Sequence, residues 1–336
     1  MSQRLEGRAS NVMNYPSYVN LLESGELDRR VSSLLGLMEP CMLCPRNCRV
    51  KRLSDRRAVC ETGRLAEVAS WCVHRGEEPC ISGRLGSGTV FFAHCNLACV
   101  FCQNHQISQE WRQGDGAVSA EELADIYLEL QAAGVHNLNW VSPSHVVPQA
   151  VEALALAARR GLNIPVVYNS GGFDSVDALR LLDGIVDVYM PDLKYAEDAA
   201  AFELSKAVGY VPNAQAALSE MWRQVGPLEM DEAGVARRGL LVRHLVLPNR
   251  MSQTEEVLRF LAEELGPGVA VSLMAQYHPS HKAREHTLVA RPVSAGEYAR
   301  ALAALEKSGL QEGYVQELSA SDHYLPDFLK EGHPFE

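Results

Sequence analysis

Apolar and polar positions along the chain repeat with two different periods, and these periods predict the order of its helices and strands. Short apolar runs of strand length recur from Gly88 onward, separated by longer segments with apolar residues at helical spacing. The predicted strands, some with the loop that follows, are residues 88–93, 136–145, 164–172, 185–194, 239–248, 269–279 and 313–317. The predicted helices lie at 119–134, 147–161, 175–184, within 197–225, and at 255–265 and 294–309. This alternation predicts an α/β fold with a parallel sheet or barrel.

Local signals support several of these boundaries. Ser119, followed by an acidic residue three positions later, is typical of a helix start, and Gly134 and Gly161 are typical of helix ends. Residues 18–38 show helical spacing interrupted near Gly25, which predicts two short helices packed on the main domain.

Polar residues follow the predicted strands at their carboxyl ends. They are Cys95 onward, residues 142–145 and 169–172, Asp192 with Lys194, Arg243 with His244, and residues 276–278. Functional groups of β/α folds collect at this edge, so the pattern predicts one site on a common rim. Taken singly, His145 or His278 is equally well explained as a helix cap or a surface histidine, because loops are polar.

The loop after the first of these strands, HCNLACVFCQN, contains Cys95, Cys99 and Cys102 in the spacing C-x3-C-x2-C. Thiolates this close together can reach one soft metal centre. Iron–sulfur and zinc sites usually take four protein ligands, and three thiolates leave one iron of a cluster open. The alternative is a structural zinc or disulfide-forming group, but the separation of Cys95 and Cys99 is too wide for a C-x2-C zinc knuckle.

A second cysteine group lies nearer the N-terminus, in CMLCPRNCRVKRLSDRRAVC. It contains Cys41, Cys44, Cys48 and Cys60, and we predict a second metal site there, holding zinc, iron or an iron–sulfur cluster. Its arginines and lysines lower thiol pKa values and offset thiolate charge, although they would also suit docking of an acidic partner. A solvated loop with free thiols is the alternative. Cys72 and Cys80 could replace Cys60 as the fourth ligand or be small buried hydrophobes.

Composition narrows the class of protein. The 336 residues are 47% hydrophobic and 22% charged, which is typical of a globular chain with one large domain, alone or with a small one. The net charge of −11 argues against general nucleic-acid binding. We find no apolar run long enough for a membrane span and no signal-peptide core at the N-terminus, so we expect a cytoplasmic protein. In that reducing compartment, nine cysteines favour metal ligands or reactive thiols over disulfides.

The cysteine spacing resembles that of the radical S-adenosylmethionine (SAM) superfamily, C-x3-C-x-aromatic-C, with Phe101 as the aromatic residue. From about residue 41 to 317 the chain is similar to one branch, the iron–sulfur proteins related to pyruvate formate-lyase activating enzymes. The similarity rests on CMLCPRNC, EEPCISG, GSGTVFFAHCNLACVFCQNHQIS, VSPSH, MPDLKY, LVRHLVLPN and SLMAQYHP. It implies a partial (β/α)6 TIM-like barrel with a 4Fe–4S cluster at its open top and an N-terminal cysteine-rich extension.

We therefore divide the chain into an N-terminal helical and cysteine-rich segment, 1–85, a radical SAM barrel, 86–320, and a C-terminal tail, 321–336. In the superfamily the open iron chelates SAM, and the reduced cluster cleaves it to methionine and a 5′-deoxyadenosyl radical. The protein supplies orientation and excludes side reactions.

The resemblance also implies roles for individual residues at the cofactor. Phe101 would back the adenine, Asp192 and Lys194 form a D-x-K motif that supports SAM, Asn169 would lie near the methionine carboxylate and His244 near the ribose. Most members carry Gly-Gly-Glu after the second strand, where this chain has Ser-Pro-Ser-His, so Ser142 or His145 would meet the amino group of SAM. Asn104, at the end of the cysteine loop, completes the predicted cofactor-binding set.

The predicted function is a radical SAM oxidoreductase that abstracts hydrogen, with a reducing donor such as flavodoxin or ferredoxin as partner. The fold resemblance does not transfer the substrate: a glycine of a partner protein, as in glycyl-radical-enzyme activation, a peptide and a small molecule all remain open. One alternative is an iron–sulfur electron-transfer or scaffold protein without SAM chemistry, and another is a zinc protein. The intact cysteine triad, Phe101 and the polar strand ends favour the enzyme.

Overall fold

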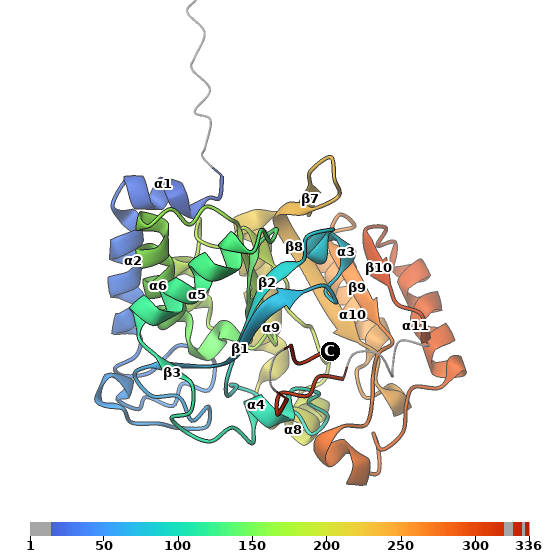
Figure 1. Ribbon diagram of the computed structural model, residues 1–336. Helices are drawn as coiled ribbons and strands as arrows, with labels where there is room; N and C mark the ends of the chain where they lie inside the picture. The colour runs from blue at the N-terminus through green and yellow to red at the C-terminus, as the bar shows by residue number, and fades with distance from the viewer. Residues whose placement is uncertain (1–14, 319–324, 331–332, 336) are drawn as a thin grey trace, which may run out of the picture.

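Seven parallel strands form the framework of the computed structural model, which describes residues 15–318, 325–330 and 333–335. Within those residues the strands lie side by side in chain order, and the two ends of the sheet do not pair with each other (Figure 1). They are β2 (Ser87–Phe92), β4 (Leu138–Val141), β5 (Val166–Asn169), β6 (Val188–Tyr189), β8 (Ala236–Leu245), β9 (Ala270–Met274) and β10 (Gly313–Val315). The predicted partial barrel is confirmed. Residues 1–14, 321–324, 331–332 and 336 of the predicted end segments lie outside the described residues.

Three antiparallel strands extend this sheet. They are β1 (Ala66–His74), which pairs with β2, β3 (Ala117–Val118), which pairs with β1, and β7 (Glu229–Met230), which pairs with β8. The sequence did not predict β1, because polar and apolar residues do not alternate regularly along it. Its partly exposed second half reflects its position beside the edge of the sheet.

The helices between the strands cover the outer face of the sheet. They are α5 (Ala120–Ala132), α6 (Val147–Arg159), α7 (Val176–Leu181), α8 (Asp198–Ser205), α9 (Tyr210–Val225), α10 (Thr254–Phe260), which continues as a π-helical turn (Leu261–Leu265), and α11 (Ala295–Ser308). Single-turn helices are α3 (Pro79–Ser82), α4 (His105–Ser108) and the 3-10 segments Arg52–Ser54, Pro143–His145, Pro248–Arg250 and His281–Glu285. The helical pattern predicted within 197–225 is divided by Lys206 and Gly209, both in the left-handed backbone region.

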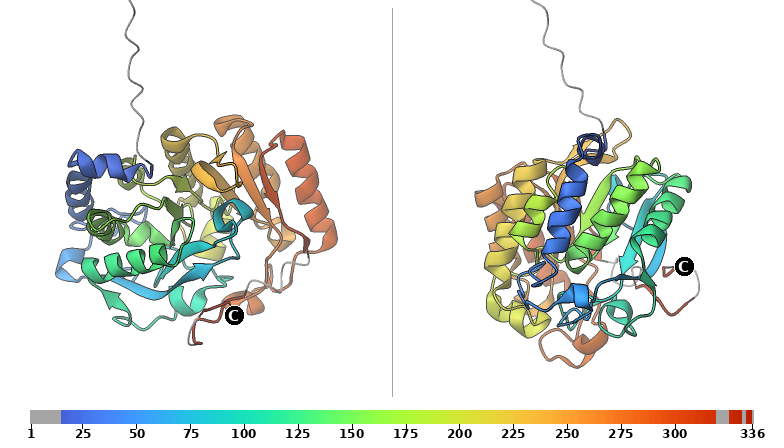
Figure 2. Two further views of the ribbon diagram at one scale, coloured as in Figure 1. Left: turned by 45° about the horizontal axis from the view of Figure 1, so that its top comes forward. Right: turned by 90° about the vertical axis from the view of Figure 1, so that its left-hand side faces the viewer.

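The N-terminal helices are a confirmed prediction. Helices α1 (Tyr18–Glu23) and α2 (Glu26–Gly36) are separated by Gly25, which has φ +73° as a left-handed turn requires. Helix α2 stands beside α6 on the outer face (Figure 2). The Tyr18 hydroxyl donates to the Ile164 carbonyl at 2.9 Å, which anchors α1 near the start of β5.

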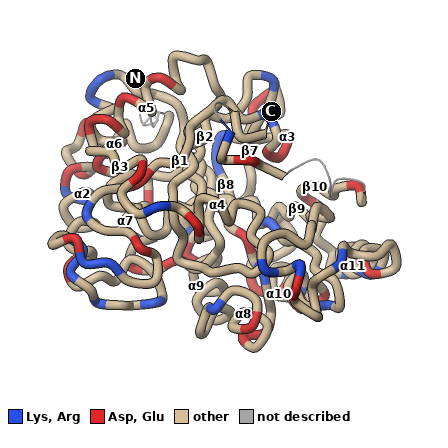
Figure 3. The backbone as a smooth tube through the Cα atoms, turned by 60° about the horizontal axis from the view of Figure 1, so that its bottom comes forward, with Lys and Arg blue, Asp and Glu red and all other residues tan. Residues whose placement is uncertain are grey.

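The core lies between the sheet and these helices, and it is closed by large buried side chains such as Trp140 on β4 and Tyr189 on β6. Acidic and basic residues are interspersed over the face in Figure 3, so neither charge forms a continuous stripe in that view. None of the helices within the described ranges has the length and apolar character that a membrane crossing needs.

Candidate functional site

A cavity of about 410 Å³ opens at the carboxyl ends of the parallel strands. The three cysteines of the loop after β2 line it, together with six of the eight predicted cofactor-binding residues: Phe101, Asn104, Ser142, Asn169, Asp192 and Lys194. The residues of the predicted common rim therefore line one open cavity. The Phe101 ring is held edge-on by Tyr277, with ring centroids 5.8 Å apart.

The cysteine loop is fixed at its start by buried polar contacts. His94 has φ +66°, its amide donates to the Ile107 carbonyl at 2.7 Å, and its ring Nε2 lies 3.0 Å from the Glu67 carboxylate. Glu67 comes from the unpredicted strand β1 and also pairs with Arg57 at 2.9 Å. These contacts hold the backbone in the turn that directs the following thiols into the cavity.

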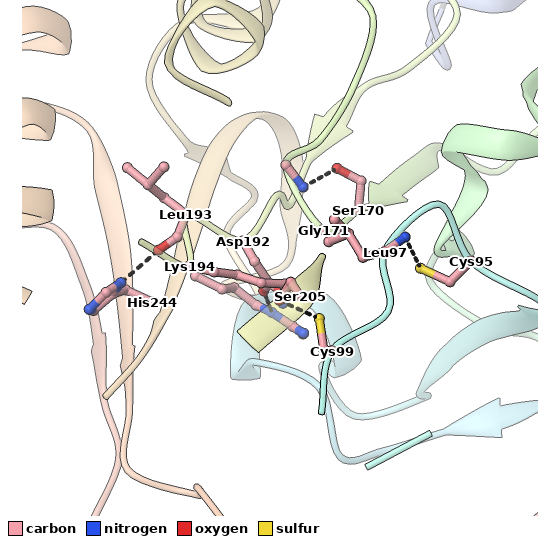
Figure 4. Close-up of polar contacts among 12 residues, drawn as sticks. Cys95, Leu97, Cys99, Ser170, Gly171, Asp192, Leu193, Lys194, Ser205 and His244 are labelled. Atoms are coloured by element: carbon pink, nitrogen blue, oxygen red, sulfur yellow. Dashed lines mark hydrogen bonds and ion pairs between the residues drawn. The ribbon is translucent and has the colours of Figure 1, made fainter. Parts of the chain in front are cut away.

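Each of the three thiols has a polar neighbour. The Leu97 amide donates to Cys95 Sγ at 3.4 Å, and Ser205 Oγ donates to Cys99 Sγ at 3.0 Å (Figure 4). Cys102 Sγ lies 3.2 Å from the hydroxyl of Ser108. Hydrogen bonds to ligating sulfur tune the reduction potential of an iron–sulfur cluster. Ser205 and Ser108 belong to no cysteine motif, so the sequence alone did not predict their contacts with the thiols.

The donor set fits a cluster better than a single ion. All three cysteines are free thiols, and burial raises the pKa of Cys95 to about 12 and of Cys102 to about 11, so a bound metal is needed to hold them as thiolates. Sulfur ligands of one tetrahedral zinc lie about 3.8 Å apart. The three sulfurs here do not all lie within 4.8 Å of one another. A cluster, in which each thiolate binds a different iron, spans that wider separation.

A chain of partly buried charged side chains begins beside Cys99. Lys194 Nζ forms an ion pair with Asp192, and Arg243 Nε donates to the other Asp192 oxygen at 3.1 Å. Arg243 also reaches Glu77 at 3.1 Å. Burial opposes ionisation of Asp192, but the two cations outweigh it and lower its pKa. Burial likewise opposes protonation of Lys194, and Asp192 outweighs it and raises the Lys194 pKa.

Glu77 is a cavity residue that the sequence analysis assigned no role. Its carboxylate accepts from the Asn139 amide group at 2.9 Å and from that of Asn169 at 3.4 Å. These contacts fix Asn169 on the cavity wall. Glu77 lies in the loop between β1 and α3, so only the folded topology brings it under the strand ends.

Two predicted cofactor-binding residues lie outside the cavity. His244 follows Arg243, which faces the cavity, and successive residues of a strand face opposite ways. The His244 ring therefore points outward, where its Nδ1 lies 2.6 Å from the Leu193 carbonyl oxygen (Figure 4). Its Nε2 lies 3.0 Å from Thr254 Oγ1. His145 is buried with Nε2 2.9 Å from the Ala93 carbonyl, and burial lowers its pKa to about 3. Neither side chain lines the cavity, so the contacts predicted for them with SAM stay predictions.

The second cysteine group is assembled in the fold. Cys41, Cys44, Cys48 and Cys60 line one small hollow of about 10 Å³ together with His145, whereas Cys72 lies on β1 and Cys80 in α3. Burial raises the pKa of Cys44 to about 12.

Two of the basic residues in this segment have internal roles. Arg46 Nε donates to the Asn96 carbonyl at 2.5 Å, and buried Arg52 donates to the carbonyl of His145 at 2.6 Å. The Asn96 side chain hydrogen-bonds to Cys44 and accepts from Cys95 Sγ at 3.8 Å. One buried side chain therefore contacts both cysteine groups.

Comparison with known proteins gives matches in sequence and in structure. The family model of the "Radical SAM superfamily" matches residues 89–220. An uncharacterized protein, MJ0674, of Methanocaldococcus jannaschii is 30% identical over 292 residues, which cover 84% of this chain and 79% of that protein.

Solved structures resemble the chain at lower identity. Methylornithine synthase (PylB) is 13% identical with a TM-score of 0.47, covering 96% of this chain and 86% of that one. A radical SAM methyltransferase from Sphaerobacter thermophilus is 16% identical with a TM-score of 0.44, covering 68% and 65%. HydG, a maturase of the [FeFe]-hydrogenase, is 14% identical with a TM-score of 0.46. The match covers 66% of this chain and 49% of HydG, so this chain spans about half the length of that protein.

Proposed function

The chain belongs to the radical SAM superfamily, and from that premise we propose that it abstracts hydrogen from a protein or peptide substrate. Membership implies an iron–sulfur cluster and cleavage of SAM. When bound, the pair would supply one-electron cleavage of SAM to methionine and a 5′-deoxyadenosyl radical, and hydrogen abstraction by that radical would leave 5′-deoxyadenosine and a substrate radical. The observation that carries the proposal is that Cys95, Cys99 and Cys102 line the same cavity as the polar residues at the strand ends.

The chain's own residues hold and orient the reactants in this proposal. Ser142 and Asn169 offer polar groups to the amino-acid end of SAM, and Phe101, braced by Tyr277, offers an apolar face to its adenine. Lys194 places a positive charge beside Cys99 and so offsets the charge of the ligating thiolates. The partly buried ion pairs from Lys194 through Asp192 to Arg243 keep these side chains in one arrangement.

The size of the cavity supports a peptide or protein as the substrate. A space of about 410 Å³ lies at the lower end of the range for small-molecule pockets, and SAM alone would fill most of it. The substrate then has to present a narrow group at the mouth, such as a glycine of a peptide loop. This is the reaction of glycyl-radical-enzyme activation, the activity of the branch that the sequence motifs resemble.

We also propose that the N-terminal cysteines hold a second iron–sulfur cluster. Four thiols converge on one hollow, and no three of their sulfurs lie within 4.8 Å of one another, which favours a cluster over one zinc ion. A reduced flavodoxin or ferredoxin in the cytoplasm would supply electrons, and the reducing compartment would keep the nine cysteines available as ligands.

The first experiment is anaerobic iron and sulfide analysis with EPR spectroscopy of the dithionite-reduced protein, with and without SAM. A 4Fe–4S signal that changes when SAM is added supports the proposal, and iron for two clusters supports the N-terminal assignment. Alanine at Cys99 should abolish SAM cleavage, and Cys72→Ala, outside both groups, should not. A signal that ignores SAM would instead favour an electron-transfer protein.

The substrate class has its own test. Peptides with glycine deuterated at the α-carbon are incubated with reduced enzyme and SAM, and the 5′-deoxyadenosine formed is analysed by mass spectrometry. Deuterium in the product supports hydrogen abstraction from glycine. Turnover in the presence of these peptides without deuterium in the product would contradict that substrate.

A further inference from the structure

A third group of metal-ligand side chains lies outside the cavity and outside both cysteine groups. His105 opens α4, Glu110 follows that helix, and His281 opens the 3-10 helix His281–Glu285. Of all the histidine, cysteine and acidic residues in the described ranges, only these three form a group whose ligand atoms lie within 4.8 Å of one another. No motif spacing joins them, because His281 is distant in sequence and the fold brings it to α4.

The separations of the ligand atoms match those around one transition-metal ion. His105 Nδ1 lies 3.2 Å from one Glu110 oxygen, and His281 Nδ1 lies 3.3 Å from the other. Neighbouring ligands of a tetrahedral zinc with bonds of about 2.0–2.1 Å lie about 3.3 Å apart. The two imidazole rings are nearly parallel, 13° apart, with centroids separated by 4.8 Å, so both present ring edges to the same carboxylate.

Hydrogen bonding within the described part of the protein does not satisfy the His105 ring. His105 Nδ1 is buried and makes no hydrogen bond of acceptable geometry with any described residue, although a Glu110 oxygen lies 3.2 Å away. Because a buried ring nitrogen without a partner costs free energy, an additional ligand at this group is favoured.

The surroundings leave room for such an ion and for water. The three side chains line a hollow of about 280 Å³ together with Lys282, Arg284 and Glu285. Glu110 and Glu285 balance the two basic residues in number, so the hollow carries no excess positive charge. Two imidazoles and one carboxylate leave coordination positions for water, and this ligand set suits zinc and the neighbouring first-row ions.

Both segments that carry these ligands hold the cysteine loop. Gln109, which directly precedes Glu110, donates from Nε2 to the Cys99 carbonyl at 2.9 Å. The Ala283 amide, in the same 3-10 helix as His281, donates to the Val100 carbonyl at 2.8 Å. An ion between the segments would therefore brace the loop from its outer side.

We propose that His105, Glu110 and His281 bind one divalent transition-metal ion of the zinc class, which ties α4 to the 3-10 helix around the cysteine loop. The site goes beyond the proposed function and does not depend on it. The competing explanation is a pair of histidine–carboxylate contacts that bind no ion.

Zinc K-edge X-ray absorption separates these explanations without interference from iron. The anaerobically reconstituted holoprotein is dialysed against one equivalent of Zn²⁺, and its zinc content is measured. The expected spectrum has a nitrogen and oxygen shell at about 2.0–2.1 Å, with one zinc per chain. His281→Ala should lose that zinc and keep its iron. His286→Ala, a matched control that removes a histidine contacting Glu203 and the Leu288 amide, should retain both.

Two outcomes would overturn the site. One is a zinc shell made only of sulfur at about 2.3 Å, which would place the metal on cysteines. The other is unchanged zinc content in His281→Ala. Where that variant fails to fold, Glu110→Gln gives the same test, because this carboxylate is 52% exposed and its replacement conserves volume. Iron content and the EPR signal, recorded in parallel, report separately on the proposed function.

Discussion

At the residue scale, the hydroxyl of Ser205 links one of the three cysteines to a buried tyrosine of the core. It donates to Cys99 Sγ at 3.0 Å and lies 2.7 Å from the Tyr195 hydroxyl. We expect Ser205→Ala to lower the reduction potential of the cluster on the order of tens of millivolts, because a lost hydrogen bond to sulfur destabilises the more negative, reduced state. A redox titration followed by EPR measures this, with exposed Ser219→Ala as the control. Equal potentials in both variants would contradict the assignment.

Protonation of Asp192 should make the free energy of unfolding depend on pH in the acid range. The pKa of Asp192 is lowered from 3.8, because its ion pairs outweigh the effect of burial. The carboxylate therefore contributes fully to the free energy of unfolding above about pH 4, and this contribution disappears as pH falls through the lower pKa of the folded state. Asp192→Asn keeps the shape but leaves Lys194 and Arg243 without this charge, and we expect a loss of about 3–5 kcal/mol at pH 7.

Urea unfolding of the wild type and of Asp192→Asn at several pH values tests this. The difference in unfolding free energy between the two proteins should shrink toward acid pH. A difference that is independent of pH would show that the carboxylate charge is not responsible.

At the element scale, the start of α5 shows how a local sequence signal becomes structure. Ser119 accepts from the Glu122 amide at 3.2 Å, and the Glu122 carboxylate accepts from the Ser119 amide at 2.8 Å, which completes a capping box. We expect Ser119→Ala to lower the unfolding free energy by about 1 kcal/mol without changing iron content. Chemical denaturation checks the first expectation and iron analysis the second. Unaltered stability would mean that tertiary packing alone fixes this helix end.

The elements also show where sequence patterns stop being informative. The parallel strands and capped helices were predictable because burial on both faces leaves apolar runs and capping leaves a short motif. Strand β1 and the division between α8 and α9 were not, because β1 depends on pairing with β2 and the division rests on left-handed backbone at Lys206 and Gly209.

At the scale of the whole molecule, the N-terminal cysteines join a segment with little secondary structure to the barrel. Metal bound there would contribute folding free energy directly. We expect Cys44→Ala to lose about one cluster of iron and to unfold at lower temperature, whereas Cys72→Ala keeps its iron. Iron and sulfide analysis with thermal unfolding measures both. Full iron content and an unchanged midpoint in Cys44→Ala would rule out a second metal site.

The part of the candidate site that could be predicted from the sequence consists of residues close in sequence to the end of a predicted strand. Cys95, Cys99 and Cys102 follow one strand, and Asn169 and Asp192 follow two others, so strand order alone places them on one rim. Glu77, Ser205 and Asn96 were not assigned roles, because their contacts join segments distant in sequence. His244 was predicted for the cofactor and faces outward because the alternation of side chains along β8 turns Arg243 inward.

Asn96 stands between the two cysteine groups, with its side chain on Cys44 and Cys95 and its carbonyl on Arg46. Ordering either group therefore positions part of the other before that group has any ligand of its own. If both groups hold metal, as we propose, sites that share a buried side chain are thermodynamically linked, and the linkage is reciprocal: filling one changes the affinity of the other by the same factor in either order of loading. Assembly of the holoprotein would then couple the two cysteine groups through Asn96.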